Sequence, residues 1–449
     1  MEKLFTQALG LTPPWSVESF NFSADDGRID FVVACHAKRL TCPGCGVPDQ
    51  PVHDRIERTW RHLNFFQFKA LIRARVPRVD CKACGKTMQV EVPWTRPGAG
   101  FTLTMEAFIV ALCREMPMAA VARRLGVSDD RIARVLDFHV AQARTQEGHD
   151  EVRQRAVDDR SAHRGQRYIT LFHDPGERRL LDATPGRKAD TFAAFSEDFK
   201  AHGGDIEAIK TISMDMSTAY QAGARKPLPK ATLCFDPFHV VALAHTALDQ
   251  VRRAETQERP ELKGRRWALL KDASNWTLNP ITTMHDLPRS NLKTARAWRL
   301  KEALRHIFAT AKDASMAKAE LEKWISWARR SRLAPFKRLG ATLRDHLEGI
   351  LEHFRTGLSN GFVEAMNGRI QAAKARARGY ATDHRLITLC DRVCGQPLDD
   401  TSPLYGPMMQ IHRKRDRAPF YTPRRVAMLR IKRPVNSNVM PLKNSPHLE

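Results

Sequence analysis

Two pairs of closely spaced cysteines constrain the fold of this chain more than any other feature of its sequence. Cys42 and Cys45 form one Cys-x-x-Cys pair, and Cys81 and Cys84 form a second pair after a long intervening segment. Each pair can place two thiolates on one tetrahedral ion, and the glycines beside them let the backbone turn its amides toward sulfur. The sequence therefore predicts one structural Zn²⁺ ion held by these four cysteines.

The segment between the cysteine pairs predicts the strands of a zinc ribbon. Phe65–Lys69 and Leu71–Val76 carry aromatic and β-branched residues in partial alternation, as half-buried strands do. Within the zinc interpretation, His53 or His62 could replace one of the cysteines. A redox role needs only one Cys-x-x-Cys pair, so the doubled motif favours metal binding.

The charge of the chain indicates a nucleic-acid partner. Lys and Arg number 73 against 50 Asp and Glu, which gives a formal net charge of +23. Such a surface attracts a polyanion, and double-stranded DNA is the leading candidate. Because 42% of the residues are hydrophobic, the chain can bury ordinary cores and is not a disordered polycation. No stretch approaches the roughly 18 uninterrupted apolar residues of a membrane span, and the start lacks a signal segment, so we expect a cytoplasmic protein without membrane contact.

Residues 118–135 predict a helix-turn-helix motif. A first short helix ends at Gly126, and Ser128 then caps a second helix. The apolar side chains that point inward in this arrangement are Val121, Ala122, Leu125, Ile132 and Val135. A helix-turn-helix places its second helix in the major groove of DNA.

The charged side chains of this motif are expected to contact DNA. At the major groove we expect Asp129, Asp130, Arg131 and Arg134. Near the phosphates we expect Arg123 and Arg124. Two packed helices of an ordinary bundle, with solvated charges, are the alternative. The neighbouring zinc module and the net charge favour DNA binding.

After residue 148 the pattern changes to short strands and helices in the order of an RNase H-like fold. Three strands are expected first, at Arg155–Asp158, Tyr168–His173 and Arg178–Leu181. A helix follows at 189–201, then a strand at 208–214, a helix, a strand at 231–235 and a helix from residue 238. In this fold the first and fourth strands lie side by side at the centre of the sheet.

That order brings Asp158 and Asp215, which are far apart in the chain, to neighbouring strand ends. Two carboxylates there can hold one or two Mg²⁺ ions, and a metal pair activates the attacking hydroxyl and stabilises the leaving oxygen of a displacement at phosphorus. A strand-end acid without a ligand is the commoner fate of a single aspartate. Asp236, with His239, also follows a strand, and it is either an auxiliary site residue or only the cap of the next helix.

Glu364 is the candidate for the third carboxylate of such a centre. At about 100° per residue, residues 360–374 separate into an apolar and a polar helix face. The apolar face holds Phe362, Val363, Met366 and Ile370, and the polar face holds Asn360, Glu364, Asn367, Gln371 and Lys374. An ordinary surface helix shows a polar face too, so periodicity alone leaves the role of Glu364 open.

The span from Cys42 to about Cys394 resembles the ISL-three family of bacterial insertion-sequence transposases. Besides the cysteine pairs, the matching residues are Asp158–Ser161 with Gly165 and Tyr168, Met214–Ser217, Phe235–Val240, and Asn360–Gly361 through Glu364 and Asn367 to Arg378–Tyr380. The resemblance implies a DDE catalytic domain whose triad is Asp158, Asp215 and Glu364, with Mg²⁺ or Mn²⁺ bound there. Asp159 stands where members commonly have Glu, and alternation along the strand favours Asp158 as the ligand. Asn367 and Lys374 are expected to contact DNA.

We therefore predict a multidomain α+β protein with an N-terminal zinc ribbon, a helix-turn-helix, and an RNase H-like α/β catalytic domain with a helical insertion. The expected boundaries are 1–95 for the zinc ribbon, 96–147 for the helix-turn-helix, 148–259 with 342–395 for the catalytic domain, 260–341 for the insertion and 396–449 for a basic C-terminal extension. Five tryptophans fall in the insertion. Most are expected in its core, although one could stack on an unpaired base.

These expectations combine into one functional hypothesis. The protein binds terminal inverted repeats as a homodimer or larger assembly at the bacterial nucleoid, and hydrolyses the phosphodiester at each end. It then uses the exposed 3′-hydroxyl to attack target DNA. The alternatives are a DNA-binding regulator with an inactive RNase H-like half, and a structure-specific nuclease without strand transfer.

Overall fold

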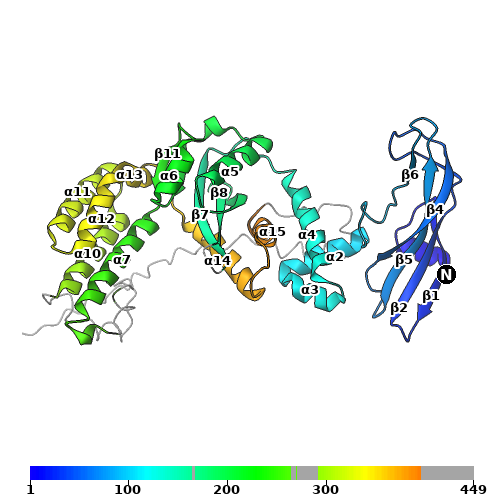
Figure 1. Ribbon diagram of the computed structural model, residues 1–449, viewed down its shortest axis with the longest axis horizontal. Helices are drawn as coiled ribbons and strands as arrows, with labels where there is room; N and C mark the ends of the chain where they lie inside the picture. The colour runs from blue at the N-terminus through cyan, green and yellow to red at the C-terminus, as the bar shows by residue number, and fades with distance from the viewer. Residues whose placement is uncertain (164–166, 264–268, 270–291, 396–449) are drawn as a thin grey trace, which may run out of the picture. The chain divides into compact units, whose positions relative to one another are not determined.

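A computed structural model describes residues 1–163, 167–263, 269 and 292–395 (Figure 1). Its elements follow one another as a β-rich N-terminal part, three helices, and an α/β part that is interrupted by a run of helices. The mixed α/β composition and the two separate sheets confirm the predicted fold class. The basic extension at 396–449 lies outside the described residues.

The N-terminal part is a six-stranded sheet preceded by helix α1 (Glu2–Ala8). Its strands are β1 (Trp15–Ser23), β2 (Arg28–Cys35), β3 (Arg39–Leu40), β4 (Gln50–Arg61), β5 (Lys69–Asp80) and β6 (Thr87–Gln89). They lie in the order β1-β2-β5-β4-β3, and β6 pairs with β5. Strand β5 buries Ala70, Ile72, Ala74 and Val76, every second residue, because alternate side chains of a strand share one face.

One of the two strands predicted between the cysteine pairs is wrong. Leu71–Val76 lies within β5, but Phe65–Phe68 forms the turn that joins β4 to β5, and Lys69 is the first residue of β5. Phe66 is 82% exposed there and has a positive φ of 52°. The antiparallel pairing of β4 with β5 requires the chain to reverse at this point, and this tertiary constraint overrides the β propensity of the phenylalanines.

Three helices follow the first sheet: α2 (Leu103–Glu115), α3 (Met118–Leu125) and α4 (Asp129–Arg144). Gly126 ends α3 with a φ of 65°, as the sequence predicts. Ser128 occupies the N-cap position of α4, but its side chain makes no capping hydrogen bond. Val121 and Ile132 are fully buried and share one apolar core with α2, which fixes α3 against α4.

The second sheet has five strands in the order β11-β10-β7-β8-β9. They are β7 (Gln154–His163), β8 (Arg167–Asp174), β9 (Arg179–Pro185), β10 (Thr211–Met214) and β11 (Thr232–Phe235). The first three strands pair antiparallel, whereas β10 is parallel to both β7 and β11. This topology confirms the prediction that the first and fourth strands of the unit are neighbours.

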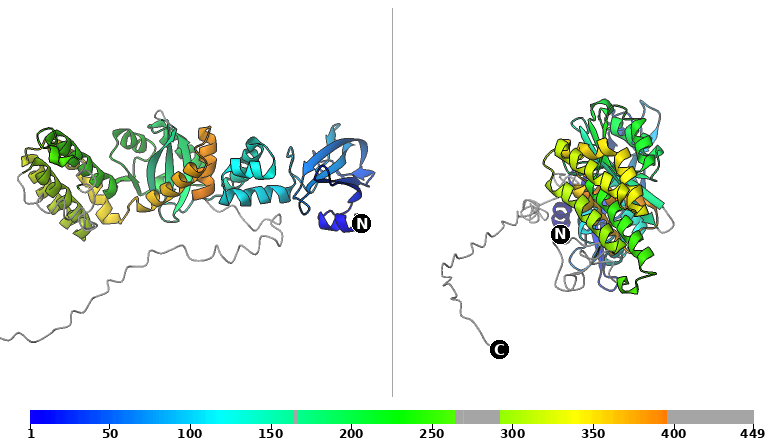
Figure 2. Two further views of the ribbon diagram at one scale, coloured as in Figure 1. Left: turned by 90° about the horizontal axis from the view of Figure 1, so that it is seen from below. Right: turned by 90° about the vertical axis from the view of Figure 1, so that its left-hand side faces the viewer.

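Helices cover both faces of this sheet (Figures 1 and 2). Helices α5 (Asp190–Ala201), α6 (Thr218–Arg225) and α7 (Pro237–Glu255) follow β9, β10 and β11, and the short 3₁₀ helix η1 (Ile206–Ala208) precedes β10. On one face, Phe192, Phe195 and Phe199 of α5 are fully buried, and Phe172 stacks on Phe195 with ring centroids 4.0 Å apart. Burial of each ring contributes about 1.5–3 kcal/mol.

The opposite face of the sheet packs against α14 (Gly361–Arg376) and α15 (Asp383–Cys394). Ile169 and Leu171 are alternate residues of β8, and both contribute to this core. They join Ile370 of α14 and Leu389 of α15 there. Because strand side chains alternate, one strand supplies both cores: Phe172 faces α5 and Leu171 faces α14. The sheet thereby holds α14, the helix of Glu364, in a fixed position.

The helical insertion contains η2 (Pro260–Leu262), α10 (Lys293–Thr310), α11 (Ala314–Arg330), α12 (Ala334–Asp345) and α13 (Leu347–Thr356). The predicted end of the insertion after residue 341 falls inside α12, and the run of helices continues to the end of α13. Trp324 is buried and its indole N–H donates to the Leu300 carbonyl at 2.8 Å, whereas Trp327 is exposed. Trp298 packs partly buried against the same core, and Trp267 and Trp276 lie outside the described residues.

No helix among the described residues has the length and apolar character that crossing a bilayer requires.

Candidate active site and metal centre

The pairing of β7 with β10 brings Asp158 and Asp215 level with each other. The last parallel pair is Ala156 with Ser213, and each aspartate lies two residues beyond its strand's member of that pair. The sequence predicted that Asp158 ends its strand, and this is wrong. Strand β7 continues to His163 because its antiparallel pairing with β8 extends beyond the end of the parallel pair, and Asp158 itself lies opposite Leu171.

Asp236 continues the same row on the next strand. Met214 and Phe235 form the last pair of β10 with β11, so Asp215 and Asp236 each follow directly after it. Three aspartates therefore lie in one row across the three neighbouring strands, just beyond the end of their parallel pairing. In α/β sheets this end is where ligands bind.

Two asparagines of the α14 segment tie it to this row. The backbone N–H of Asn360 donates to Asp236 Oδ1 at 2.9 Å, and Ser213 Oγ donates to Asn360 Oδ1 at 2.8 Å. About two turns further along α14, Asn367 Nδ2 donates to Asp158 Oδ2 at 2.7 Å. Both asparagines are buried, so these bonds are shielded from solvent.

Glu364 lies between the two asparagines on the same face of α14. It follows Asn360 by four residues and precedes Asn367 by three, and both spacings place side chains on one helix face. Burial raises the pKa of Glu364, and the nearby carboxylates of Asp236 and Asp158 raise it further. Glu364 therefore lies close enough to the aspartates for their charges to affect it, and its role as the third carboxylate stays a prediction.

The two adjacent acids of β7 face opposite sides of the strand. Burial raises the pKa of Asp158, although Arg160, with a guanidinium nitrogen 3.1 Å away, lowers it. Burial also raises the pKa of Asp159, and the charge of Asp215 adds to that increase. Asp158 thus faces α14, whereas Asp159 lies on the opposite side of the strand, where hydrogen bonding with Tyr220 of α6 lowers its pKa.

Asp236 is the cap of α7, one of the two interpretations that the sequence left open, and a role as an auxiliary site residue stays a prediction. It caps α7 by accepting the His239 backbone N–H at 3.4 Å, and its Oδ2 lies 3.1 Å from His239 Nδ1. That hydrogen bond raises the pKa of His239, and the charges of Asp158 and Asp215 raise it further. Nothing in the sequence indicated the bond between Asp236 and Asn360, because its donor is a backbone N–H, which does not depend on residue identity.

The carboxylates have the chemistry of a divalent-cation site, since hard cations select oxygen ligands. Asp158 Oδ1 accepts the Asp159 N–H, while its Oδ2 accepts bonds from both Arg160 and Asn367. A carboxylate has about four lone-pair positions, so Asp158 retains one for a cation. In the part of the chain that the structure describes, however, Asp158, Asp215 and Glu364 do not gather their oxygens within 4.8 Å, a limit that only the four cysteines meet.

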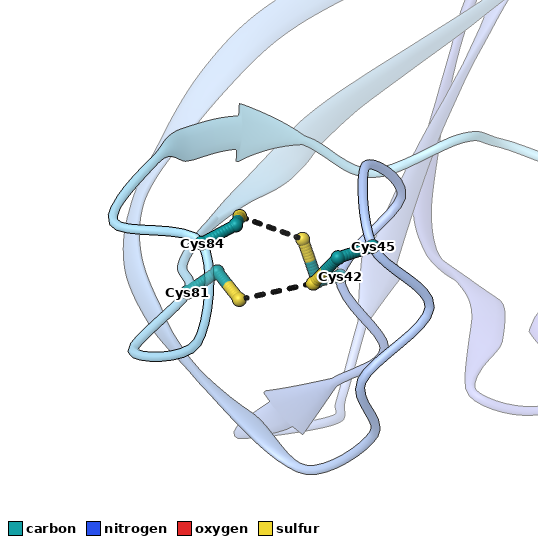
Figure 3. Close-up of side chains that lie close together, drawn as sticks. All are labelled: Cys42, Cys45, Cys81 and Cys84. Atoms are coloured by element: carbon teal, nitrogen blue, oxygen red, sulfur yellow. Dashed lines mark hydrogen bonds between the residues drawn. The ribbon is translucent and has the colours of Figure 1, made fainter.

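The cysteine cluster consists of Cys42 and Cys45, between β3 and β4, and Cys81 and Cys84, between β5 and β6 (Figure 3). Their sulfur atoms point toward one another, with Sγ–Sγ distances of 3.9 Å for Cys42 to Cys84 and 3.4 Å for Cys45 to Cys81. Tetrahedral zinc with Zn–S bonds of about 2.3 Å separates its sulfur ligands by about 3.8 Å. The four thiols therefore fit one Zn²⁺ ion.

Glycines shape both cysteine loops in the same way. Gly46 and Gly85 each follow the first cysteine of their pair by four residues and donate to its carbonyl at 2.9 Å. Their φ values of 73° and 65° are in the left-handed region that favours glycine. His62 bonds to Thr102 Oγ1 instead, and no histidine among the described residues belongs to the cluster, which excludes the histidine-ligand alternative.

Neighbouring thiols of the cluster affect one another's pKa values because they lie so close together. Hydrogen bonding from the Cys84 amide lowers the pKa of Cys81 to about 7. The Val47 amide lowers that of Cys45, but the Cys81 thiol and burial outweigh it and raise the pKa of Cys45 to about 12. Four neighbouring thiolates repel one another, and a divalent cation removes that penalty because it stabilises each negative charge.

Family models account for nearly all of this architecture. A model described as "Transposase" matches residues 156–389, one described as "Helix-turn-helix domain of transposase family ISL3" matches residues 90–140, and one described as "zinc-finger of transposase IS204/IS1001/IS1096/IS1165" matches residues 38–84. The chain belongs to the ISL3 family of transposases. The resemblance seen in the sequence is thereby confirmed, and the four cysteines form the structural zinc site of its zinc ribbon.

Curated relatives support the same assignment. The chain is 27% identical over 390 residues to the transposase for insertion sequence element IS1001 of Bordetella parapertussis, covering 85% of this chain and 95% of that protein. It is 29% identical over 427 residues to the transposase for insertion sequence element IS1557 of Mycobacterium tuberculosis, covering 86% and 94%. This chain is thus a DNA transposase, and the regulator and nuclease alternatives are not favoured.

The helix-turn-helix residues of this transposase differ in what they contact. Arg123, Arg124 and Arg134 are exposed. The Arg131 guanidinium, which the sequence assigned to the groove, lies 4.2 Å from the Phe101 ring centroid and donates to the Gly100 carbonyl at 3.3 Å. The carboxylates assigned to the groove, Asp129 and Asp130, both pair with Arg385 of α15.

Asn367 and Lys374 of α14, which were both expected to contact DNA, also differ in what they contact. Asn367 is 1% exposed and its amide is bonded to Asp158, so the structure makes it a positioning residue for that carboxylate. Lys374 lies at the surface, where its ammonium donates to the Ser161 carbonyl at 2.7 Å. Its contact with DNA stays a prediction.

Proposed function

We propose that Asp158, Asp215 and Glu364 form the DDE centre of this transposase and bind one or two Mg²⁺ or Mn²⁺ ions. The observation that carries the proposal is the alignment of the two aspartates at equal distance beyond the last pair of β7 and β10. The bonds of Asn360 and Asn367 to the same row of acids add support, because they place Glu364 beside it.

Divalent ions at this site supply a nucleophilic hydroxyl and stabilise charge on the leaving oxygen. Hydrogen bonds from other residues of the chain fix the positions of the Asp158 and Asp215 carboxylates. Arg160 and Asn367 fix the Asp158 carboxylate from two sides, and the Ser217 N–H donates to Asp215 Oδ1 at 2.9 Å. Burial and neighbouring carboxylates raise the pKa of Glu364, where the neighbours are Asp236 and Asp158, and of Asp158, where the neighbour is Asp159; a bound cation would offset this repulsion.

The reaction proposed for this centre is hydrolysis at each transposon end followed by attack of the exposed 3′-hydroxyl on target DNA. No covalent protein intermediate is needed, because the three carboxylates act only as metal ligands. The helix-turn-helix and transposase domains support DNA binding. We further propose that the protein acts on paired ends as a homodimer or larger assembly at the bacterial nucleoid, with the exposed arginines of the helix-turn-helix at the DNA.

The test is Asp215→Asn in the full-length protein, assayed on a duplex that carries the element's terminal inverted repeat. We expect cleavage with Mg²⁺ to be lost and binding of the end to be retained. Asp190→Asn is the matched control, because Asp190 is an exposed carboxylate on α5 that lies outside the row of acids. Cleavage that survives in Asp215→Asn overturns the assignment. Joining of precleaved ends to a target separates a transposase centre from one that only cuts.

A further inference from the structure

A recess of about 680 Å³ lies along the groove between β7 and α14, beyond the proposed catalytic acids. The residues that line it come from the end of β7, from the last turns of α14 and from the segment after α14, and they include Ser161, Gln371, Lys374, Arg378 and Tyr380. None of these lining residues is acidic, whereas two carry a positive charge. The recess therefore suits an anionic ligand.

Its distance from the acids follows from the two elements that build it. Ser161 is three residues beyond Asp158 on β7, which is about 10 Å at about 3.3 Å per residue. Gln371 is seven residues beyond Glu364 on α14, which is also about 10 Å at about 1.5 Å per residue. Phosphates of one DNA strand are spaced about 3.4 Å along the duplex axis, so the recess lies about three nucleotides from a phosphate held by the acids.

Arg378 is held at this recess in an unfavourable backbone conformation. The N–H of Gly379 donates to the Lys374 carbonyl and the N–H of Arg378 to the Ala375 carbonyl, both at 3.0 Å, which closes α14 with a Schellman motif. The left-handed position of this motif is usually glycine, but here Arg378 occupies it with a φ of 58°. Backbone strain of this kind concentrates at functional positions.

The guanidinium of Arg378 is exposed and makes no hydrogen bond or ion pair with the residues that the structure describes. The side chain is therefore available to a ligand in the recess. A phosphate would suit it, since a guanidinium fork matches phosphate oxygens.

Lys374 and Tyr380 supply the other two features of a nucleotide site. The Lys374 ammonium bridges α14 to β7 through the Ser161 carbonyl at 2.7 Å and has three hydrogens, so it can also donate to a phosphate. Tyr380 is partly buried against the core of α14 and α15, and it also lines the recess. Cations next to an aromatic ring are the composition of sites that hold a single nucleic-acid strand.

We propose that this recess is a subsite for the DNA strand that carries the scissile bond. Lys374 and Arg378 contact a phosphate about three nucleotides from that bond, and a base stacks on Tyr380. The proposal rests on the proposed function, because the position of the acids defines where the scissile phosphate lies.

The experiment compares the full-length protein with Arg378→Gly and a matched control, Arg332→Gly. Arg332 also follows a helix end, that of α11, and has a φ of 60°, so both changes remove one exposed guanidinium and relieve the same strain. The probes are terminal-repeat duplexes in which one phosphate at a time, at successive positions from the scissile bond, is replaced by an uncharged methylphosphonate. Binding is measured by fluorescence anisotropy with Ca²⁺, which requires no cleavage.

We expect wild type to lose about five- to tenfold in affinity when the neutral linkage is about three nucleotides from the scissile bond. Arg378→Gly should show a smaller difference between that duplex and the unmodified duplex, because only Lys374 still contacts the phosphate, whereas Arg332→Gly should keep the wild-type difference. A difference of wild-type size in Arg378→Gly, or no difference in wild type, overturns the subsite. This test measures binding, whereas the Asp215→Asn test measures cleavage. If Asp215→Asn still cleaved DNA, the proposed centre would be wrong, but the binding measurements would still decide whether the subsite exists.

A second readout addresses the base. The adenine analogue 2-aminopurine, placed next to the sensitive phosphate, should be quenched by wild type and by Tyr380→Phe, since both have an aromatic ring. Tyr380→Leu should lose the quenching. Equal quenching by the leucine variant overturns the stacking interaction, even if the phosphate contact is found.

Discussion

Replacing Asn367 with leucine tests whether α14 positions the carboxylates of the proposed catalytic centre. Leucine has nearly the shape of asparagine but cannot donate to Asp158 Oδ2, the acceptor 2.7 Å from Asn367 Nδ2. Asn367 Oδ1 has no partner among the described residues, so the change removes only this one bond. The bond is buried and its acceptor is a carboxylate, and such hydrogen bonds contribute about 1.5–3 kcal/mol.

That energy corresponds to about a 10- to 100-fold loss, the range found when residues that orient metal ligands are removed. The assay is single-turnover cleavage of a labelled terminal-repeat duplex over a series of Mg²⁺ concentrations. We expect the Mg²⁺ requirement to rise and the maximal rate to fall, while the affinity for the uncleaved duplex stays the same.

Gly368→Ala is the control for the helix itself. Gly368 is the next residue on α14, and a methyl group there meets no atom within 4 Å, so this variant should cleave as wild type does. If Asn367→Leu also cleaves as wild type at every Mg²⁺ concentration, the bond to Asp158 does not position a metal ligand, and the argument from the α14 geometry fails.

The remaining predictions concern the adjacent acids, the zinc site and a buried carboxylate. Asp158→Asn should abolish cleavage, whereas Asp159→Asn should keep it within about tenfold, and the reverse result in a cleavage assay would exchange their roles. Cys81→Ser should release zinc, measured by elemental analysis, and lower the melting temperature, because zinc binding stabilises the folded ribbon; an unchanged zinc content would contradict the site. Burial raises the pKa of Asp391 to about 7 although Arg144 lowers it, so folding stability should fall as pH rises from 3.8 to about 7. Asp391→Asn should remove this loss and be more stable above that window, by up to about 4 kcal/mol in denaturant titrations; a variant with the wild-type pH dependence would exclude the shift.

Much of this architecture was predictable because the signals are local. The Cys-x-x-Cys loops close through glycines four residues after each first cysteine, and the end of α3 at Gly126 depends on one left-handed residue. The strand and helix order after residue 148 was equally readable, because alternation and helical spacing each repeat within a few residues. Where long-range pairing competed with local preference, at Phe65–Lys69 and beyond Asp158, the prediction was wrong.

The sequence by itself determined which acids were candidates and on which face of its helix Glu364 lies. Only the tertiary structure decided how they are held: Asp236 reaches Asn360 across 124 residues of chain, and Asp158 reaches Asn367 across 209. In the folded protein Asn367 is hydrogen-bonded to the Asp158 carboxylate, and Arg378 is exposed in a backbone conformation suited to glycine. The physical reason is that residue identity and spacing fix local conformation, whereas contacts between distant residues depend on strand register and helix packing, which the whole core sets together.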